Sequence, residues 1–108
     1  FLEPAREALG APVEVIDGER EAALTFLAAT RAFPAEVARG TSAVIDIGGG
    51  STEVILADRG MPTWRKSLPL GSVRLTERFV AHDPAAAEEV AAVSREATDL
   101  LAEVPIDG

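Results

Sequence analysis

The chain has no cysteine and only one histidine, His82, among its 108 residues. The lack of cysteine excludes a disulfide framework and a thiolate metal site, and a single histidine cannot form a histidine metal cluster. No apolar run approaches the ~20 residues that span a bilayer, and no stretch resembles a signal peptide. Basic side chains are scarce too, since ten Lys and Arg stand against eighteen Asp and Glu. We therefore expect a cytoplasmic protein that binds neither membranes nor nucleic acids.

The remaining composition is that of a globular protein, with 47% hydrophobic and 26% charged residues. A chain of this length fits one domain and buries roughly two thirds of its unfolded surface. The net charge of −8 is unevenly distributed. Residues 1–40 carry −3, residues 41–80 carry +1 and residues 81–108 carry −6. Because the glycines gather in the middle stretch, the overall acidity does not exclude an anion site there.

Periodicity and turn residues predict a mixed α/β chain. The compact apolar run of residues 43–47, interrupted only by Asp46, is typical of a buried strand. Asp83 is expected to cap the last helix, with Pro84 at its first position. The other expected elements are helices over 2–9, 19–32 and 71–79, strands over 13–16, 53–57 and 61–68, and a linker over 34–42.

A glycine-rich turn between two expected strands is the most informative segment. Gly48, Gly49 and Gly50 lack Cβ atoms, so their backbone amides can converge on a phosphate, and Ser51 and Thr52 add hydroxyl donors. A Walker A loop would need a lysine that is absent here. A dinucleotide fingerprint would open a helix, whereas a strand follows here. A plain β-hairpin with a glycine-rich turn is the alternative interpretation.

Carboxylates flank this turn and recur upstream. Asp46 and Glu53 could hold a hydrated Mg²⁺ beside a phosphate, because magnesium favours oxygen ligands and keeps several waters. Asp46 lies within an apolar strand, and a buried carboxylate needs a partner, which favours a functional role. Glu21 could be a general base that orients water for attack on phosphorus. Alternatively, if Gly18 is the N-cap, Glu21 closes a capping box.

The remaining polar side chains allow two interpretations. The basic residues near the turn could line a path for a polyanion, but a solvated face is the commoner explanation for scattered charges. His82 beside Asp83 indicates an exposed loop. The basic residues in question are Arg65, Lys66, Arg74 and Arg78.

Three segments together resemble one family. Residues 44–53, Val-Ile-Asp-Ile-Gly-Gly-Gly-Ser-Thr-Glu, resemble the second phosphate-binding segment of the exopolyphosphatase/guanosine-pentaphosphate phosphatase (Ppx/GppA) family. Residues 67–79 resemble the segment that follows it, and residues 15–22 resemble the upstream segment that carries the catalytic glutamate. The segments occur in family order with family-like spacing, and the resemblance extends from residue 1 to about 103.

The resemblance implies part of an actin-like, sugar-kinase or Hsp70 ATPase (ribonuclease H-like) fold, with two α/β lobes around a cleft. Residues 1–40 would end the first lobe, and residues 41–108 would open the second with a glycine-turn hairpin and a third strand. It also implies hydrolysis of the terminal phosphoanhydride of inorganic polyphosphate or pppGpp by in-line attack of water, with Mg²⁺. The whole protein would be a homodimer.

Roles carry over at matching positions. Glu21 would be the catalytic base, and Asp46 and Glu53 would serve the metal. The other members of the phosphate-binding set would be Gly48, Gly49, Gly50, Ser51 and Thr52, together with Asp46.

The chain also departs from the family pattern. Asp17 stands where the family usually has serine. The family's first phosphate loop has no counterpart in residues 1–40, and the later C-terminal regions are absent too. Phe1 is not a natural start. We therefore expect an excised piece that holds half a cleft, is inactive alone and could self-associate.

Two other functions compete with this hypothesis. A non-hydrolytic phosphate-binding or regulatory module could use the same hairpin, although such a binder would not need Glu21 as a base. A sugar-kinase-like ATPase would share the hairpin but not the segment over residues 67–79.

Overall fold

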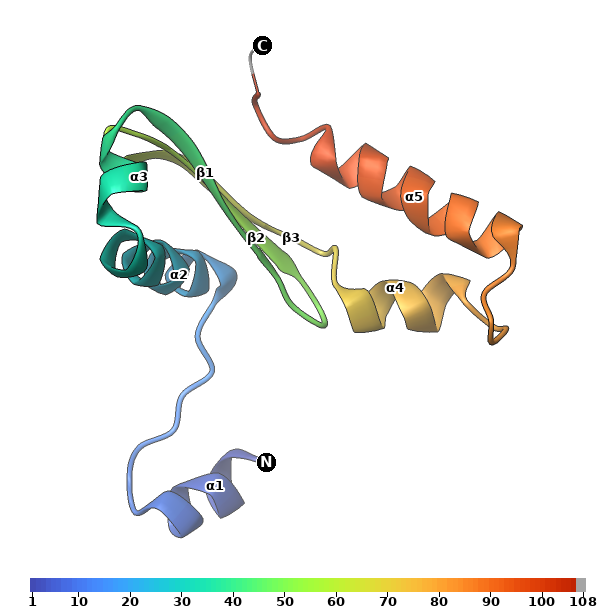
Figure 1. Cartoon of the computed structure of the whole chain (residues 1–108). Helices are drawn as coiled ribbons and strands as arrows, with labels where there is room; N and C mark the ends of the chain where they lie inside the picture. The colour runs from blue at the N-terminus through green and yellow to red at the C-terminus, as the bar shows by residue number, and fades with distance from the viewer. Residues whose placement is uncertain (107–108) are drawn as a thin grey trace.

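The computed structural model describes residues 1–106, and they form the expected mixture of helices and strands (Figure 1). Strands β1 to β3 form one antiparallel sheet in the order β1-β2-β3. The elements are α1 (Leu2–Leu9), α2 (Gly18–Ala32), α3 (Pro34–Ala38), β1 (Thr41–Ile47), β2 (Thr52–Asp58), β3 (Met61–Leu68), α4 (Ser72–Phe79) and α5 (Ala87–Leu101).

The sheet separates two small hydrophobic clusters, because successive side chains of a strand point to opposite faces. On one face, Ala22 and Phe26 of α2 and Val37 of α3 pack against Ile55 and Ala57 of β2. Helices α2 and α3 therefore cover this face (Figure 1). On the opposite face, the buried residues are Val54, Leu68, Leu70 and Val104, with Leu75 of α4 and Ala97 and Leu100 of α5 packed against them.

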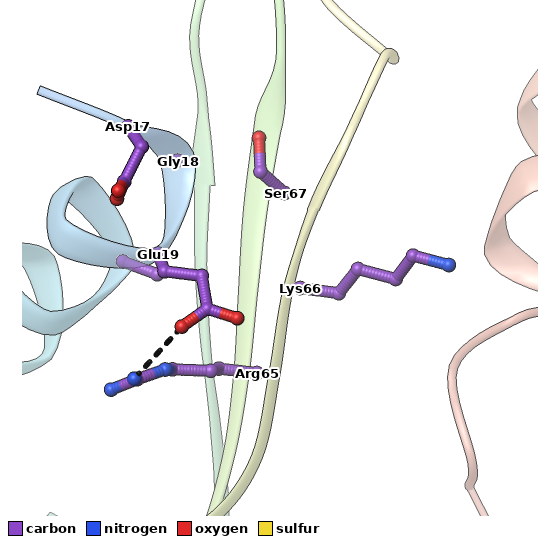
Figure 2. Close-up of a pocket in the computed structure, with 7 residues that line it drawn as sticks. Asp17, Gly18, Glu19, Arg65, Lys66 and Ser67 are labelled. Carbon is purple, nitrogen blue, oxygen red and sulfur yellow. Dashed lines mark hydrogen bonds and ion pairs between the residues drawn. The ribbon is translucent and has the colours of Figure 1, made fainter.

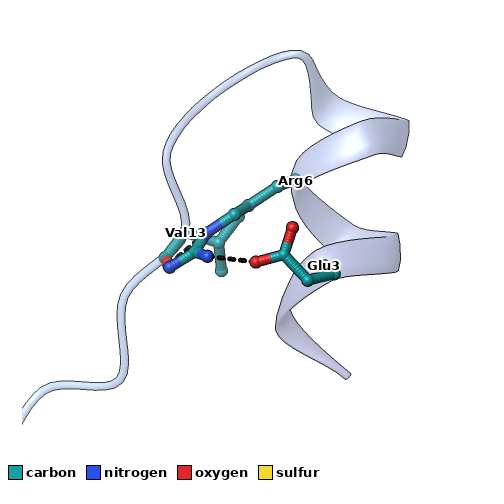
Figure 3. A network of polar contacts seen from close by, with 3 residues as sticks. All are labelled: Glu3, Arg6 and Val13. Atoms are coloured by element: carbon teal, nitrogen blue, oxygen red, sulfur yellow. Dashed lines mark hydrogen bonds and ion pairs between the residues drawn. The ribbon is translucent and has the colours of Figure 1, made fainter.

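Helix α1 lies away from the sheet, and the segment after it is not the strand expected over residues 13–16 (Figure 1). Instead, the Arg6 guanidinium donates two hydrogen bonds, of 3.2 and 3.1 Å, to the carbonyl oxygen of Val13 and pairs with Glu3 (Figure 3). The β-rich composition was misleading because a strand also needs a partner, and none pairs with this segment within residues 1–106.

The prediction that residues 43–47 form a buried strand is half right. These residues belong to β1, but the strand is exposed or half-buried throughout, with Ile45 56% and Ile47 71% exposed. Strand β1 is an edge strand of the three-stranded sheet, and the only strands that contribute to the second cluster within residues 1–106 are β2 and β3. An apolar run therefore predicted the strand correctly, whereas its burial depended on neighbours that residues 1–106 do not supply.

Two local predictions are corrected by helix geometry. Residues 34–38 of the expected linker form α3, which Pro34 begins and whose Val37 is buried. The last helix begins at Ala87 and not at Pro84, so Asp83 does not cap it. None of the described helices is long and apolar enough to cross a bilayer.

Glu89 ties the start of α5 to the loop before it. Its carboxylate accepts hydrogen bonds of 2.8 Å from the backbone amides of Ala81 and Ala86, and lies 2.8 Å from Nδ1 of the exposed His82. These donors, with the Ala81 amide contributing most, lower the pKa of Glu89 from 4.5 to about 2. The carboxylate thus takes the capping role expected of Asp83.

We expect Glu89→Gln to lower the melting temperature at pH 7, because the charged carboxylate binds both amides more strongly than a neutral amide does. Because the pKa of Glu89 is lowered in the folded chain, its charged carboxylate stabilises the fold above pH 4.5. This stabilisation is lost as the pH falls towards about 2. Thermal unfolding of wild type and variant should therefore converge as the pH falls through that range. Glu88→Gln, an exposed change in the same helical turn, is the matched control. A constant difference down to pH 2 would contradict this account.

Candidate functional site

The glycine-rich turn joins β1 to β2 at one end of the sheet, beside the start of α4 (Figure 1). The amide of Gly48 donates a 2.8 Å hydrogen bond to the carbonyl oxygen of Ser51, which closes the turn. The amide of Gly48 therefore has an internal partner.

Helix α4 binds the three glycine carbonyl groups. The backbone amide of Ser72 donates to Gly48 O at 3.0 Å, and that of Arg74 donates to Gly49 O at 3.0 Å. The Arg74 side chain completes the set, because its Nε donates to Gly50 O at 2.8 Å. The first amides of a helix have no partner within the helix, so the turn and α4 satisfy each other.

This arrangement sets the direction of the next three amides. In a trans peptide the C=O and N–H groups point in opposite directions, and the peptides of this turn are trans. With the carbonyl groups directed at α4, the amides of Gly49, Gly50 and Ser51 point away from it. No backbone acceptor within residues 1–106 takes these three N–H groups. Successive backbone N–H groups that are left free in a turn can form an anion-binding concavity.

The glycines serve close approach and not an unusual conformation. No glycine of the turn has a positive φ, unlike Gly10 and Gly60. A Cβ on Gly49 would lie 3.3 Å from Val73, whereas a Cβ on Gly50 would meet nothing within 4 Å. The space beside Gly50 is therefore open to a ligand.

A row of polar side chains crosses the sheet next to the turn. Asp46 lies directly opposite Glu53, and Glu53 lies opposite Ser67, so the three share the face covered by α2. Glu53 is only 2% exposed and accepts a 2.7 Å hydrogen bond from Ser67 Oγ. The expectation that Asp46 is the buried carboxylate was wrong, because Asp46 lies exposed on the edge strand.

Helix α2 brings Glu21 to this face. Asp17, and not Gly18, is the N-cap, since its Oδ1 accepts from the Arg20 amide at 2.8 Å, so the predicted capping box is absent. Glu21 is exposed and precedes Thr25 by one helical turn. Thr25 Oγ1 in turn donates to Asp46 Oδ2 at 3.3 Å. Glu21 therefore lies on the same side of α2 as Thr25, the residue that binds Asp46 of β1.

The carboxylate pair fits a magnesium ion better than a metal that needs a complete protein cage. Within residues 1–106 no three His, Asp or Glu side chains gather in a way that could hold a metal. Magnesium is usually bound by one or two carboxylates, with waters and substrate phosphates as the other ligands. Asp46 and Glu53, adjacent across β1 and β2, meet that requirement.

Thr52 lies differently from the other expected phosphate ligands. Its side chain is 2% exposed and its hydroxyl donates to the carbonyl oxygen of Leu70. Because side chains alternate along β2, Thr52 faces away from Glu53. Its hydroxyl therefore binds the segment that leads into α4.

Beside the row lies a pocket of about 380 Å³ (Figure 2). Glu19 and Arg65 form a 3.2 Å ion pair across it. A Cβ on Gly18 would lie 2.6 Å from the Cβ of Ser67, so only glycine lets α2 approach β3 this closely. Lys66 also lines the pocket, but its side chain points away from Glu19 and Arg65 (Figure 2). Its Nζ pairs with Glu103.

Sequence reasoning missed the supporting residues. The sequence allows Arg74 to be either a solvated or a polyanion-binding residue, and it indicates no role for Ser67 or Thr25. The period-2 pattern carried a signal for Ser67, since β2 and β3 place it opposite Glu53 once the register is known. Nothing in the sequence indicated the bond from Arg74 to Gly50.

Several known proteins are similar to this chain over most of its length. An uncharacterised protein of Streptomyces coelicolor is 47% identical over 88 residues, which are 80% of this chain and 26% of the relative. The Ppx/GppA enzyme of Aquifex aeolicus is 36% identical, with a TM-score of 0.78 over 99% of this chain and 36% of its own. An exopolyphosphatase from Cytophaga hutchinsonii is 34% identical, with a TM-score of 0.80 over 97% of this chain and 32% of its own.

The chain thus spans between a quarter and just over a third of these relatives. The Ppx/GppA structures have the actin-like ATPase fold, of which this chain covers part. The model of the Ppx/GppA phosphatase family matches residues 1–107. A turn with free amides, a carboxylate pair and these relatives lead to one conclusion: the chain belongs to the Ppx/GppA phosphatase family.

Proposed function

We propose that this chain supplies the phosphate-binding turn and the water-activating carboxylate of a phosphoanhydride hydrolase. Its substrate would be inorganic polyphosphate or pppGpp, from which it would release the terminal phosphate. The observation that carries the proposal is the binding of three glycine carbonyls by α4, because it turns the amides of Gly49, Gly50 and Ser51 away from the helix and leaves them without a backbone acceptor. The similarity to an exopolyphosphatase supports polyphosphate as the substrate.

In the proposed mechanism, the chain's own groups hold the phosphate and prepare the water. The three free amides donate to the oxygens of the terminal phosphoryl group, on which charge is spread during transfer. Glu21 accepts a proton from water as that water attacks phosphorus in line with the leaving oxygen. The Thr25–Asp46 bond keeps α2 beside the carboxylate row.

Asp46 and Glu53 are the residues that would hold Mg²⁺. The positive charge of the ion would reduce the repulsion between the phosphate and the carboxylates of the site. Ser67 holds Glu53 in one orientation through its hydroxyl group.

The proposal also covers the activity, location and oligomeric state of the whole protein. Activity would require a second lobe that supplies the opposite wall of the cleft, so residues 1–108 alone would be inactive. Cytoplasmic location and homodimerisation are proposed from the family resemblance.

Replacement of the proposed base provides the first test. In the two-lobe protein that contains this chain, we expect Glu21→Gln to lower kcat for phosphate release from polyphosphate by about 10²- to 10⁴-fold, because the amide cannot accept the proton. Glu19→Gln is the control on the same helix, since it removes only an exposed ion pair. Asp46→Asn should raise the Mg²⁺ concentration needed for half-maximal rate.

Two results would contradict the assignment. Full activity of both Glu21→Gln and Asp46→Asn would overturn these roles. Phosphate binding by a wild-type protein without turnover of polyphosphate or pppGpp would favour the non-hydrolytic module.

The space beside Gly50 provides a second test. Gly50→Ala should leave the fold intact or slightly stabilise it, since the position has no left-handed φ and a Cβ meets no atom within 4 Å. The new methyl group would nevertheless occupy the proposed ligand space, so we expect a weaker affinity for tripolyphosphate by roughly 10-fold or more. Gly40→Ala, equally open but remote from the turn, is the control for calorimetric titration. Equal affinity of the two variants would count against the phosphate site.

A further inference from the structure

We propose that Arg74 is a positioning residue that orients the Ser51 amide for phosphate through its hydrogen bond to Gly50 O. This inference rests on the proposed function and assigns a structural cause to it. The carbonyl of Gly50 and the amide of Ser51 belong to one peptide plane, so a donor that holds the carbonyl also sets the amide direction.

The side chain of Arg74 has a task that backbone atoms do not share. Main-chain amides of Ser72 and Arg74 hold Gly48 O and Gly49 O, and any residue except proline would offer those donors. Gly50 O instead accepts from Arg74 Nε at 2.8 Å, a charge-assisted bond. Gly50 has no side chain, and a Cβ built on it would meet nothing within 4 Å, so no side chain of its own anchors this peptide.

Gly71 permits this contact. A Cβ at Gly71 would overlap Gly49 O, Gly49 C and Gly50 C. All three are backbone atoms, which cannot move aside as a flexible side chain can. Gly71 has φ −121° and ψ 151°, so its need for glycine is one of space and not of conformation. The close approach brings the start of α4 within reach of the turn.

The neighbouring basic residues differ from Arg74 in their partners. Arg65, Lys66 and Arg78 each pair with a carboxylate, from Glu19, Glu103 and Glu96 respectively. Within residues 1–106, Arg74 forms no such ion pair, and its guanidinium binds the glycine turn. Its role is therefore distinct from that of an exposed, ion-paired arginine.

The test compares two arginines of the same helix in the two-lobe protein that contains this chain. We expect Arg74→Ala to raise KM for polyphosphate by roughly 10-fold while kcat changes less, because a hydrogen bond to a charged donor is lost. Arg74→Lys, which keeps a charged donor, should recover part of that loss. Arg78→Ala is the matched control, since Arg78 pairs with Glu96 on α5 and does not contact the turn. Its KM should stay at the wild-type value.

A second measurement separates this inference from the proposed function. With ¹⁵N-serine labelling and no ligand, the order parameter of the Ser51 amide should fall in Arg74→Ala and not in Arg78→Ala. An unchanged Ser51 amide, or equal effects of both variants, would overturn the positioning role. Absence of phosphate hydrolysis and binding in the wild type would instead overturn the proposed function, while the ligand-free comparison still decides the role of Arg74.

Discussion

The contact between the glycine turn and the start of α4 is the interaction on which the rest of the site depends. Three consecutive carbonyls would otherwise be free to rotate with their flexible glycines. Two helix amides and one guanidinium nitrogen hold them instead. The same bonds satisfy α4 amides that a helix leaves without partners. One set of contacts thus builds the helix start and sets the direction of the binding amides.

The carboxylate row is set by a second constraint, the close packing of α2 on the sheet. Gly18 allows α2 to approach Ser67, and the Thr25–Asp46 bond anchors the helix about two turns further on. Cross-strand register then places Asp46 and Glu53 side by side. The turn and the row lie at the same end of the β1–β2 hairpin, so a phosphate at the amides would be close to the carboxylates.

Much of this could be predicted from the sequence, because its signals are local. The hairpin over β1 and β2 follows from apolar runs around a glycine turn, and the family follows from three motifs in order. Burial could not be predicted, since it depends on neighbours: Asp46 is exposed and Glu53 is buried, although both flank the same turn. Long-range bonds such as Arg74 to Gly50 join segments 24 residues apart and leave no periodic signal.

In the proposed site the amides of Gly49, Gly50 and Ser51 donate to the phosphate, whereas the amide of Gly48 donates to Ser51 O within the turn. The most direct measurement is a titration of the ¹⁵N-labelled two-lobe protein with tripolyphosphate and Mg²⁺, followed through its backbone amide resonances. We expect large shifts of the amide resonances of Gly49, Gly50 and Ser51 and a small shift of that of Gly48. Saturable binding that leaves the first three resonances unmoved would contradict the proposed site.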